Sequence, residues 1–130
     1  MALRAADRQA VRNRASGRCE YCHMEEAWEP FYSYHLEHII ARQHGGPDDL
    51  DNLAYACHHC NLLKGPNLTS LDPDTGALTE LFHPRLDRWT KHFRIHTEKI
   101  VGLTAKGRAT VFLMKMNVAH RSELRKINAP

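Results

Sequence analysis

The sequence has 130 residues, of which 42% are hydrophobic and 25% are charged. This length accommodates one ordinary domain or a small module with an extension, and the composition excludes disordered and fibrous chains. A net charge of +3 and a pI near 8.8 allow nucleic acid as a partner without requiring it, and the sequence has no apolar run of 18 residues that could span a membrane.

The N-terminal segment predicts a basic helix. Residues 1–7 contain no apolar core of signal-peptide length, so we expect a cytoplasmic protein. Small and apolar residues recur between arginines over residues 4–15, which predicts a weakly amphipathic helix that ends at Ser16-Gly17.

The next elements predict a hairpin followed by a helix. Aromatic and β-branched residues predict a strand over 31–40, and the Gly-Gly-Pro chemistry of residues 43–49 predicts a loop. A short strand over 53–56 then leads into a helix over 58–64, which Gly65-Pro66 ends.

The remainder of the chain predicts mixed α/β structure. Two short extended segments flank a turn at 72–76, and a helix follows over 85–93. After the helix, β-prone segments cover 93–96 and 100–103. Two helices, over 104–116 and 118–128, complete the chain. The expected core residues of this part are Trp89, Phe93, Phe112 and Met116.

Four cysteines form two C-x-x-C pairs, Cys19 with Cys22 and Cys57 with Cys60. Disulfides seldom persist in a reducing compartment, so the pairs predict one structural zinc ion per chain, held by four thiolates. Four protein ligands leave no open position, and we therefore expect this zinc to be non-catalytic. Four unrelated buried thiols, or His58 or His59 as a replacement ligand, are the alternatives.

The segment between the cysteine pairs contains the residue types that phosphodiester hydrolysis needs. His38 is a candidate base, and Glu37 and Asn61 are oxygen donors that suit Mg²⁺ or Mn²⁺. Arg42 and Lys64 are candidate contacts to nucleic-acid phosphates, with solvated charge as the alternative. Alternation along a strand places Glu37 and His38 on opposite faces, which conflicts with a shared site unless the strand bends.

The span from Cys19 to Gly65 resembles the HNH endonucleases whose ββα-metal finger is braced by a four-cysteine zinc site. The motifs that carry the resemblance are Glu37-His38-Ile39-Ile40, Asp51-Asn52-Leu53, Cys57-His58-His59-Cys60-Asn61 and Lys64-Gly65. The resemblance implies that His38 is the general base, that Glu37 and Asn61 bind a catalytic Mg²⁺ or Mn²⁺, and that Asn52 orients His38 by bonding to the loop backbone. Glu37 stands where aspartate is more usual in the family, and Asn61 where histidine is.

We therefore expect an α+β fold, with a small ββα-metal (His-Me finger) nuclease module and its N-terminal helix at residues 1–66. A mixed α/β C-terminal extension at 67–130 is expected to pack on this module as one compact domain. The expected function is metal-dependent endonucleolytic hydrolysis of nucleic acid, with double-stranded DNA as the substrate.

Two other functions stay open at this point. The same zinc and basic arms would suit a zinc-stapled nucleic-acid-binding module without catalysis, which predicts salt-dependent binding and no cleavage. A protein-interaction module is the third hypothesis, with the acidic stretch 20–29 and its Trp28 as the contact surface.

Overall fold

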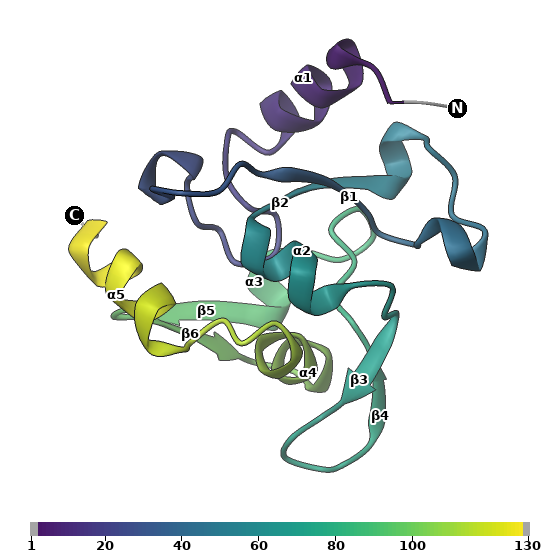
Figure 1. Cartoon of the computed structure of the whole chain (residues 1–130). Coiled ribbons are helices and arrows are strands. Elements are labelled where there is room, and N and C mark those ends of the chain that lie inside the picture. Colours follow the sequence, from purple (N-terminus) through teal and green to yellow (C-terminus); the bar gives the residue numbers. More distant parts are fainter. Residues whose placement is uncertain (1–2, 129–130) are drawn as a thin grey trace. The chain divides into compact units, whose positions relative to one another are not determined.

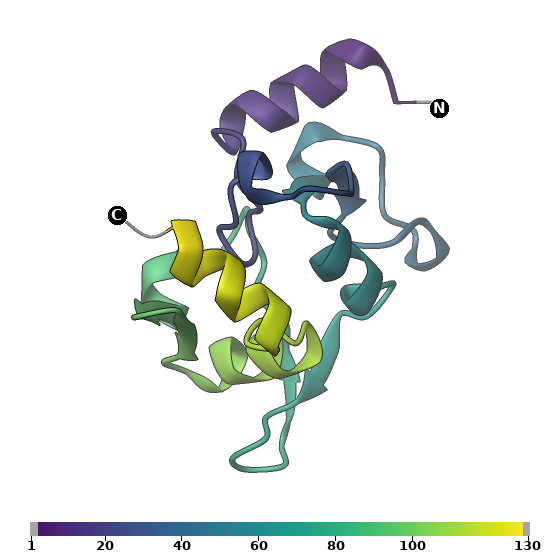
Figure 2. The same cartoon turned by 60° about the vertical axis from the view of Figure 1, so that its left-hand side comes forward.

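The computed structural model describes residues 3–128, which form two compact units that divide between Pro66 and Asn67. Both units combine short helices with two-stranded sheets (Figures 1 and 2), which confirms the predicted α+β class. Among the described residues, no helix combines the length and the apolar character needed to cross a membrane. That the extension packs on the module as one domain stays a prediction.

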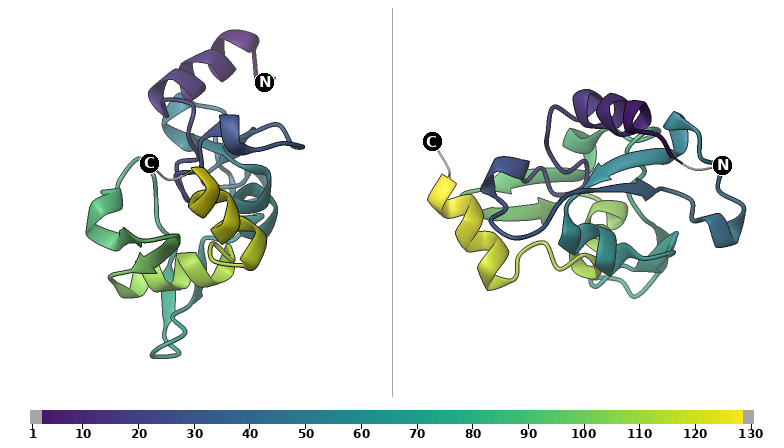
Figure 3. Two further views of the ribbon diagram at one scale, coloured as in Figure 1. Left: turned by 90° about the vertical axis from the view of Figure 1, so that its left-hand side faces the viewer. Right: turned by 45° about the horizontal axis from the view of Figure 1, so that its top comes forward.

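The first unit is built around a hairpin and a helix in the order β1, β2, α2. Strand β1 (His35–His38) pairs antiparallel with β2 (Leu53–Ala56), and α2 (His58–Lys64) follows at once. Helix α1 (Ala5–Arg14) contacts β2, whereas α2 contacts β1, so the hairpin lies between the two helices (Figures 1 and 3). All four residues of β2 are buried, which makes this strand the centre of the unit's core.

The first strand is shorter than the prediction of 31–40. The Glu29 carboxylate accepts hydrogen bonds from the backbone N–H groups of Phe31 and Tyr32 at 2.8 and 3.1 Å. These N–H groups are therefore not available to a strand partner, and the Phe31 side chain is 85% exposed. Aromatic content alone led to the longer prediction.

The second unit contains two hairpins and three helices. Strands β3 (Thr69–Leu71) and β4 (Leu78–Glu80) form one hairpin, and β5 (Phe93–His96) and β6 (Lys99–Gly102) form the other. The helices are α3 (Trp89–His92), α4 (Ala105–Leu113) and α5 (Ala119–Asn128). The predicted helix over 85–93 is wrong in its first half, because His83 Nδ1 accepts from the N–H groups of Arg85 and Leu86 and forms a turn there.

Phe93 and Met116 are buried as predicted, and Trp89 is partly buried, but Phe112 is 66% exposed and is not a core residue. Helix α4 instead packs through small residues. A Cβ atom on Gly107 would lie 2.0 Å from the backbone oxygen of His92, so only glycine permits this close approach.

Candidate functional site

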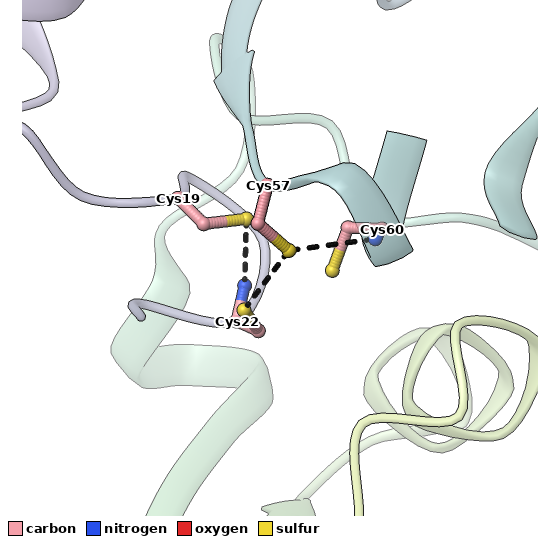
Figure 4. Close-up of side chains that lie close together, drawn as sticks. All are labelled: Cys19, Cys22, Cys57 and Cys60. Carbon is pink, nitrogen blue, oxygen red and sulfur yellow. Dashed lines mark hydrogen bonds between the residues drawn. The ribbon is translucent and has the colours of Figure 1, made fainter. Parts of the chain in front are cut away.

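The four cysteines gather at one point of the first unit (Figure 4). Cys19 and Cys22 come from the turn after α1, whereas Cys57 and Cys60 come from the start of α2. All four side chains are buried, and their Sγ atoms lie within 4.8 Å of one another. Within residues 3–128 this is the one cluster of three or more histidine, cysteine or acidic groups that could hold a metal ion.

The cluster fits a zinc ion. Four sulfurs at about 2.3 Å from a tetrahedral zinc are separated by roughly 3.8 Å, and the Sγ atoms of Cys22 and Cys57 are 3.8 Å apart. In each pair the backbone N–H of the second cysteine points to the sulfur of the first, at 3.5 Å for Cys22 and 3.4 Å for Cys60. Burial raises the pKa of the Cys19 thiol and that of the Cys60 thiol well above the ordinary value of a cysteine. A bound cation would stabilise the thiolate forms of both residues.

The cysteine cluster also fixes the local fold. Because Cys57 directly follows β2 and caps the N-terminus of α2, a metal there joins the hairpin to the helix. Cys19 N–H donates to the Met24 carbonyl, which closes the turn that carries the first cysteine pair. The site is therefore a brace for the ββα unit.

His38, the predicted base, forms a short contact with an acid. Its Nε2 lies 2.7 Å from Oδ1 of Asp48, and both side chains are largely buried, at 15% and 16% exposed. Arg42 donates from Nε to the same oxygen at 3.0 Å, while its own side chain is 60% exposed. The hydrogen bonds from His38 and Arg42 lower the pKa of the Asp48 carboxyl, which is therefore ionised at neutral pH.

The loop that carries Asp48 is held by Asn52. The Asn52 amide oxygen accepts from the N–H of Ile40, and its Nδ2 donates to the carbonyls of Ile40 and Pro47, all at 2.8–2.9 Å. A Cβ atom on Gly46 would lie 1.7 Å from the Ile40 oxygen, so the loop can close over β1 only with glycine there. Asn52 thus makes backbone bonds of the kind that the resemblance implies, and its catalytic role stays a prediction.

Glu37 lies on the other side of β1 in a buried ion pair. Its Oε1 is 2.7 Å from Nζ of Lys64, and its Oε2 accepts from the Tyr21 hydroxyl at 2.6 Å. The Glu37 and Lys64 side chains are 4% and 2% exposed, and Lys64 also donates to the Ile39 carbonyl. Burial raises the pKa of the Glu37 carboxyl, and the attraction of Lys64 opposes this rise.

This arrangement does not fit a catalytic Mg²⁺ or Mn²⁺ between Glu37 and Asn61. Both Glu37 oxygens already have partners, and its side chain offers no open face to solvent. Asn61 lines a separate pocket with His35 rather than with Glu37 or His38. Lys64, buried in its pair, does not reach an external phosphate in this structure, whereas Arg42 does remain exposed.

Four further histidines of the first unit lie near the cysteine cluster or in the loop after β1. Tyr32 stacks on His58 with ring centroids 4.0 Å apart, and the ring centroid of His35 lies 5.7 Å from that of His58. His44 is exposed in the loop after β1. Both His58 and His59 are partly buried, and neither is part of the four-sulfur cluster.

Two residues that the sequence interpretation missed complete these contacts. Asp48 belongs to the loop that the turn residues 43–49 predict, and nothing in that pattern indicates its contact with His38 ten residues earlier. Tyr21 lies between the first two cysteines, where nothing in the sequence indicates that it reaches Glu37 sixteen residues later.

Comparison with protein families agrees with the resemblance. Residues 19–67 match the family model described as HNH endonuclease, which covers the four cysteines, His38 and Asn61. No curated protein matches the chain, and no solved structure does. The chain therefore contains an HNH domain with a four-cysteine site that could hold zinc, and such a domain indicates a nuclease or nucleic-acid-binding function.

Proposed function

We propose that the HNH domain hydrolyses phosphodiester bonds in nucleic acid, with His38 as the general base. The observation that carries the proposal is the contact of His38 with Asp48 in a loop that Asn52 and Gly46 hold. A histidine held by an ionised carboxylate is the arrangement that general-base catalysis uses to orient an imidazole.

In this proposal, Nδ1 of His38 is the nitrogen that acts as the base. An ionised carboxylate can only accept hydrogen bonds. Nε2 of a neutral His38 therefore carries the ring proton and donates a hydrogen bond to Asp48. The lone pair is then on Nδ1, which takes the proton of the attacking water. Asp48 stabilises the imidazolium that results, since the new positive charge lies beside a fixed negative charge.

Arg42 has two roles in this proposal. Its guanidinium donates to Asp48, and its exposed part would contact a backbone phosphate near His38. Asn52 acts through the loop and orients His38 without touching the substrate.

Further properties belong to the same proposal. We expect double-stranded DNA as the substrate and a cytoplasmic location, the latter because four free thiols persist in a reducing compartment. HNH endonucleases are typically metal-dependent, and a divalent cation supplies charge stabilisation at the leaving oxygen when bound. The Glu37 carboxylate is buried and contacts Tyr21 and Lys64, so Glu37 takes no part in the proposed hydrolysis.

Cleavage of supercoiled plasmid tests the proposal. Wild type, His38→Ala and the exposed control His44→Ala are compared at equal zinc content, with Mg²⁺, Mn²⁺ or no added divalent cation. We expect wild type and His44→Ala to cut only when Mg²⁺ or Mn²⁺ is added, and His38→Ala to lose about 10²–10⁴-fold in rate, as removal of a general base does. Equal cutting by His38→Ala would show that another group is the base.

A zinc-stapled nucleic-acid-binding module without catalysis is the second candidate function. The buried Glu37–Lys64 pair favours it, because an implied metal ligand, Glu37, and a candidate phosphate contact, Lys64, bind each other inside the fold. This candidate predicts salt-dependent binding of wild type to DNA with no cleavage under any metal condition.

A further inference from the structure

We propose that a pocket at the start of β1 binds a backbone phosphate of the nucleic acid, a subsite separate from His38. The inference rests on the proposed function, because it assumes a nucleic-acid ligand. The pocket has a volume of about 410 Å³ and lies within the first unit, between the first turns of α1, the start of β1 and α2. Its polar lining comes from Arg4, Arg8, His35 and Asn61.

The lining is cationic and contains no acidic residue. Arg8 of α1 and Arg4 just before it line the pocket, while the other lining residues are uncharged or are histidine. The exposed Arg4 side chain lies 3.6 Å from the Asp7 carboxylate, so Arg8 is the cation that has no acidic side-chain partner within 4 Å among the described residues. The nearby Glu26, whose charge reaches Arg8, is already paired with Arg12 and with the Tyr55 hydroxyl. An anion is therefore the ligand that this pocket favours.

Arg8 is held in position before any ligand binds. Its Nη2 donates to the Tyr34 carbonyl at 2.8 Å, and its Cζ lies 5.8 Å from the centroid of the Tyr55 ring. A guanidinium has five N–H donors, and among the described residues the Arg8 side chain has this one hydrogen bond. Several donors thus remain for an oxyanion, and the loss of side-chain entropy on binding is small.

Two uncharged groups add donors beside the arginines. Within residues 3–128, the side chains of Asn61 and His35 make no hydrogen bond, although both line the pocket and are partly shielded from solvent. Phosphate oxygens in nucleic-acid complexes are held by this combination of arginine, amide and ring N–H donors. The volume of about 410 Å³ accommodates a phosphate with its attached sugar, as a backbone phosphate of the proposed nucleic-acid ligand requires.

The pocket explains why Asn61 lies apart from Glu37. The family motif places Asn61 directly after the last cysteine, and the first turns of α2 direct this residue toward His35 and Arg8 rather than toward Glu37. Asn61 would then position the nucleic acid, while His38 acts on the opposite face of β1.

Salt-dependent binding of a 20-base-pair duplex tests the subsite. Fluorescence anisotropy is measured on the zinc-loaded His38→Ala background without added divalent cation, so that no cleavage interferes. The pocket variant is Arg4→Gln/Arg8→Gln, and the matched control is Arg18→Gln/Arg94→Gln, which removes two exposed arginines. Each lost phosphate contact lowers the slope of log K against log salt by about 0.9. Because the subsite holds one phosphate, we expect the first pair to lower the slope by about 0.9, so that fourfold more salt weakens binding roughly 3.5-fold less than in wild type.

The control pair should leave the slope close to the wild-type value, because neither arginine lines the pocket. Arg8 also contacts Tyr34 and Tyr55, so Asn61→Asp serves as a second variant, which adds a negative charge to the pocket without removing those contacts. It should weaken duplex binding at least 10-fold at low salt. Zinc content and circular dichroism verify that each variant is folded.

The outcomes separate this inference from the proposed function. Unchanged binding by both pocket variants overturns the subsite, even if wild type cuts plasmid through His38. Weakened binding by both variants supports the subsite, even if wild type proves unable to cut. If the control pair lowers the slope as much as the pocket pair, the binding is diffuse and the subsite is likewise overturned.

Discussion

Substitution of Lys64 by methionine tests whether the Glu37–Lys64 pair is a structural element. The variant leaves the Glu37 carboxylate buried, with the Tyr21 hydroxyl as its remaining hydrogen-bond partner among the contacts described above, and removes the bond from Nζ to the Ile39 carbonyl. Removal of one partner from a buried ion pair lowers the free energy of unfolding by about 3–5 kcal/mol. That is a large share of the roughly 5–15 kcal/mol that a domain has.

Urea unfolding of the zinc-loaded protein, followed by release of zinc to a colorimetric indicator, measures the first unit alone. With a urea m-value of about 1–2 kcal/mol/M, the midpoint should fall by at least about 1.5 M. Arg18→Met is the matched control, since it also removes one positive charge from this unit but at an exposed position. The free energy of unfolding of this control should differ from that of wild type by no more than about 0.5 kcal/mol.

The pH dependence has a definite sign. Burial raises the pKa of Glu37, so the ionised carboxylate is the unfavourable form in the folded state, and its contribution to stability falls as pH rises through this raised pKa. Without Lys64 the pKa rises further, and the destabilisation of Lys64→Met should shrink as the pH is lowered below neutrality. In the Glu37→Gln/Lys64→Met double variant, the loss should be smaller than the sum of the two single losses.

Unfolding of Lys64→Met at the wild-type urea midpoint would refute this reasoning. The pair would then contribute nothing to stability, and Lys64 would again be a candidate contact to nucleic-acid phosphate. A fall in duplex affinity without a fall in stability would point to the same conclusion.

Three further predictions concern the zinc brace and the loop over β1. Cys57→Ser should abolish binding of one zinc ion per chain and unfold the first unit, measured by metal analysis and circular dichroism, because the metal joins the hairpin to the helix. Asp48→Asn should lower the cleavage rate at least 10-fold and shift the ¹⁵N resonances of His38 toward a mixture of tautomers, because the carboxylate no longer fixes the proton on Nε2. Gly46→Ala should lower the unfolding free energy by about 1–3 kcal/mol, measured by urea unfolding, because the new methyl group overlaps the Ile40 oxygen.

The two predictions for the loop over β1 each have a control. Asp49→Asn removes an adjacent exposed acid and should leave both the cleavage rate and the His38 resonances unchanged. Gly45→Asn changes a glycine with open space around it in a left-handed conformation that asparagine tolerates, and should be milder than Gly46→Ala. Retained zinc in Cys57→Ser, wild-type resonances in Asp48→Asn, or full stability in Gly46→Ala would contradict the corresponding argument.

Spacing in the sequence was sufficient to predict the cluster of four cysteines and the ββα order. Two residues between cysteines place both sulfurs on one turn, and a strand that leads directly into the second pair fixes where α2 begins. The alternation of β1 also predicted that Glu37 and His38 face opposite sides, and the structure gives them separate partners.

Long-range partners were beyond the reach of the sequence. Lys64 and Tyr21 are 27 and 16 residues from Glu37, and only the folded unit shows that they enclose it. The exposed Phe112 has a similar cause, because the close approach of Gly107 to His92 decides which face of α4 is buried, and hydrophobicity does not report on such an approach.

The central claim is that His38, held by Asp48, is the base for phosphodiester hydrolysis, and single-turnover cleavage of an end-labelled duplex measures it most directly. Wild type and His38→Ala are compared with excess enzyme, at one zinc per chain and equal duplex affinity. The account predicts a cleavage rate for His38→Ala at least 100-fold below wild type with unchanged binding. A rate equal to wild type, or no cleavage by wild type with any divalent cation, would contradict it.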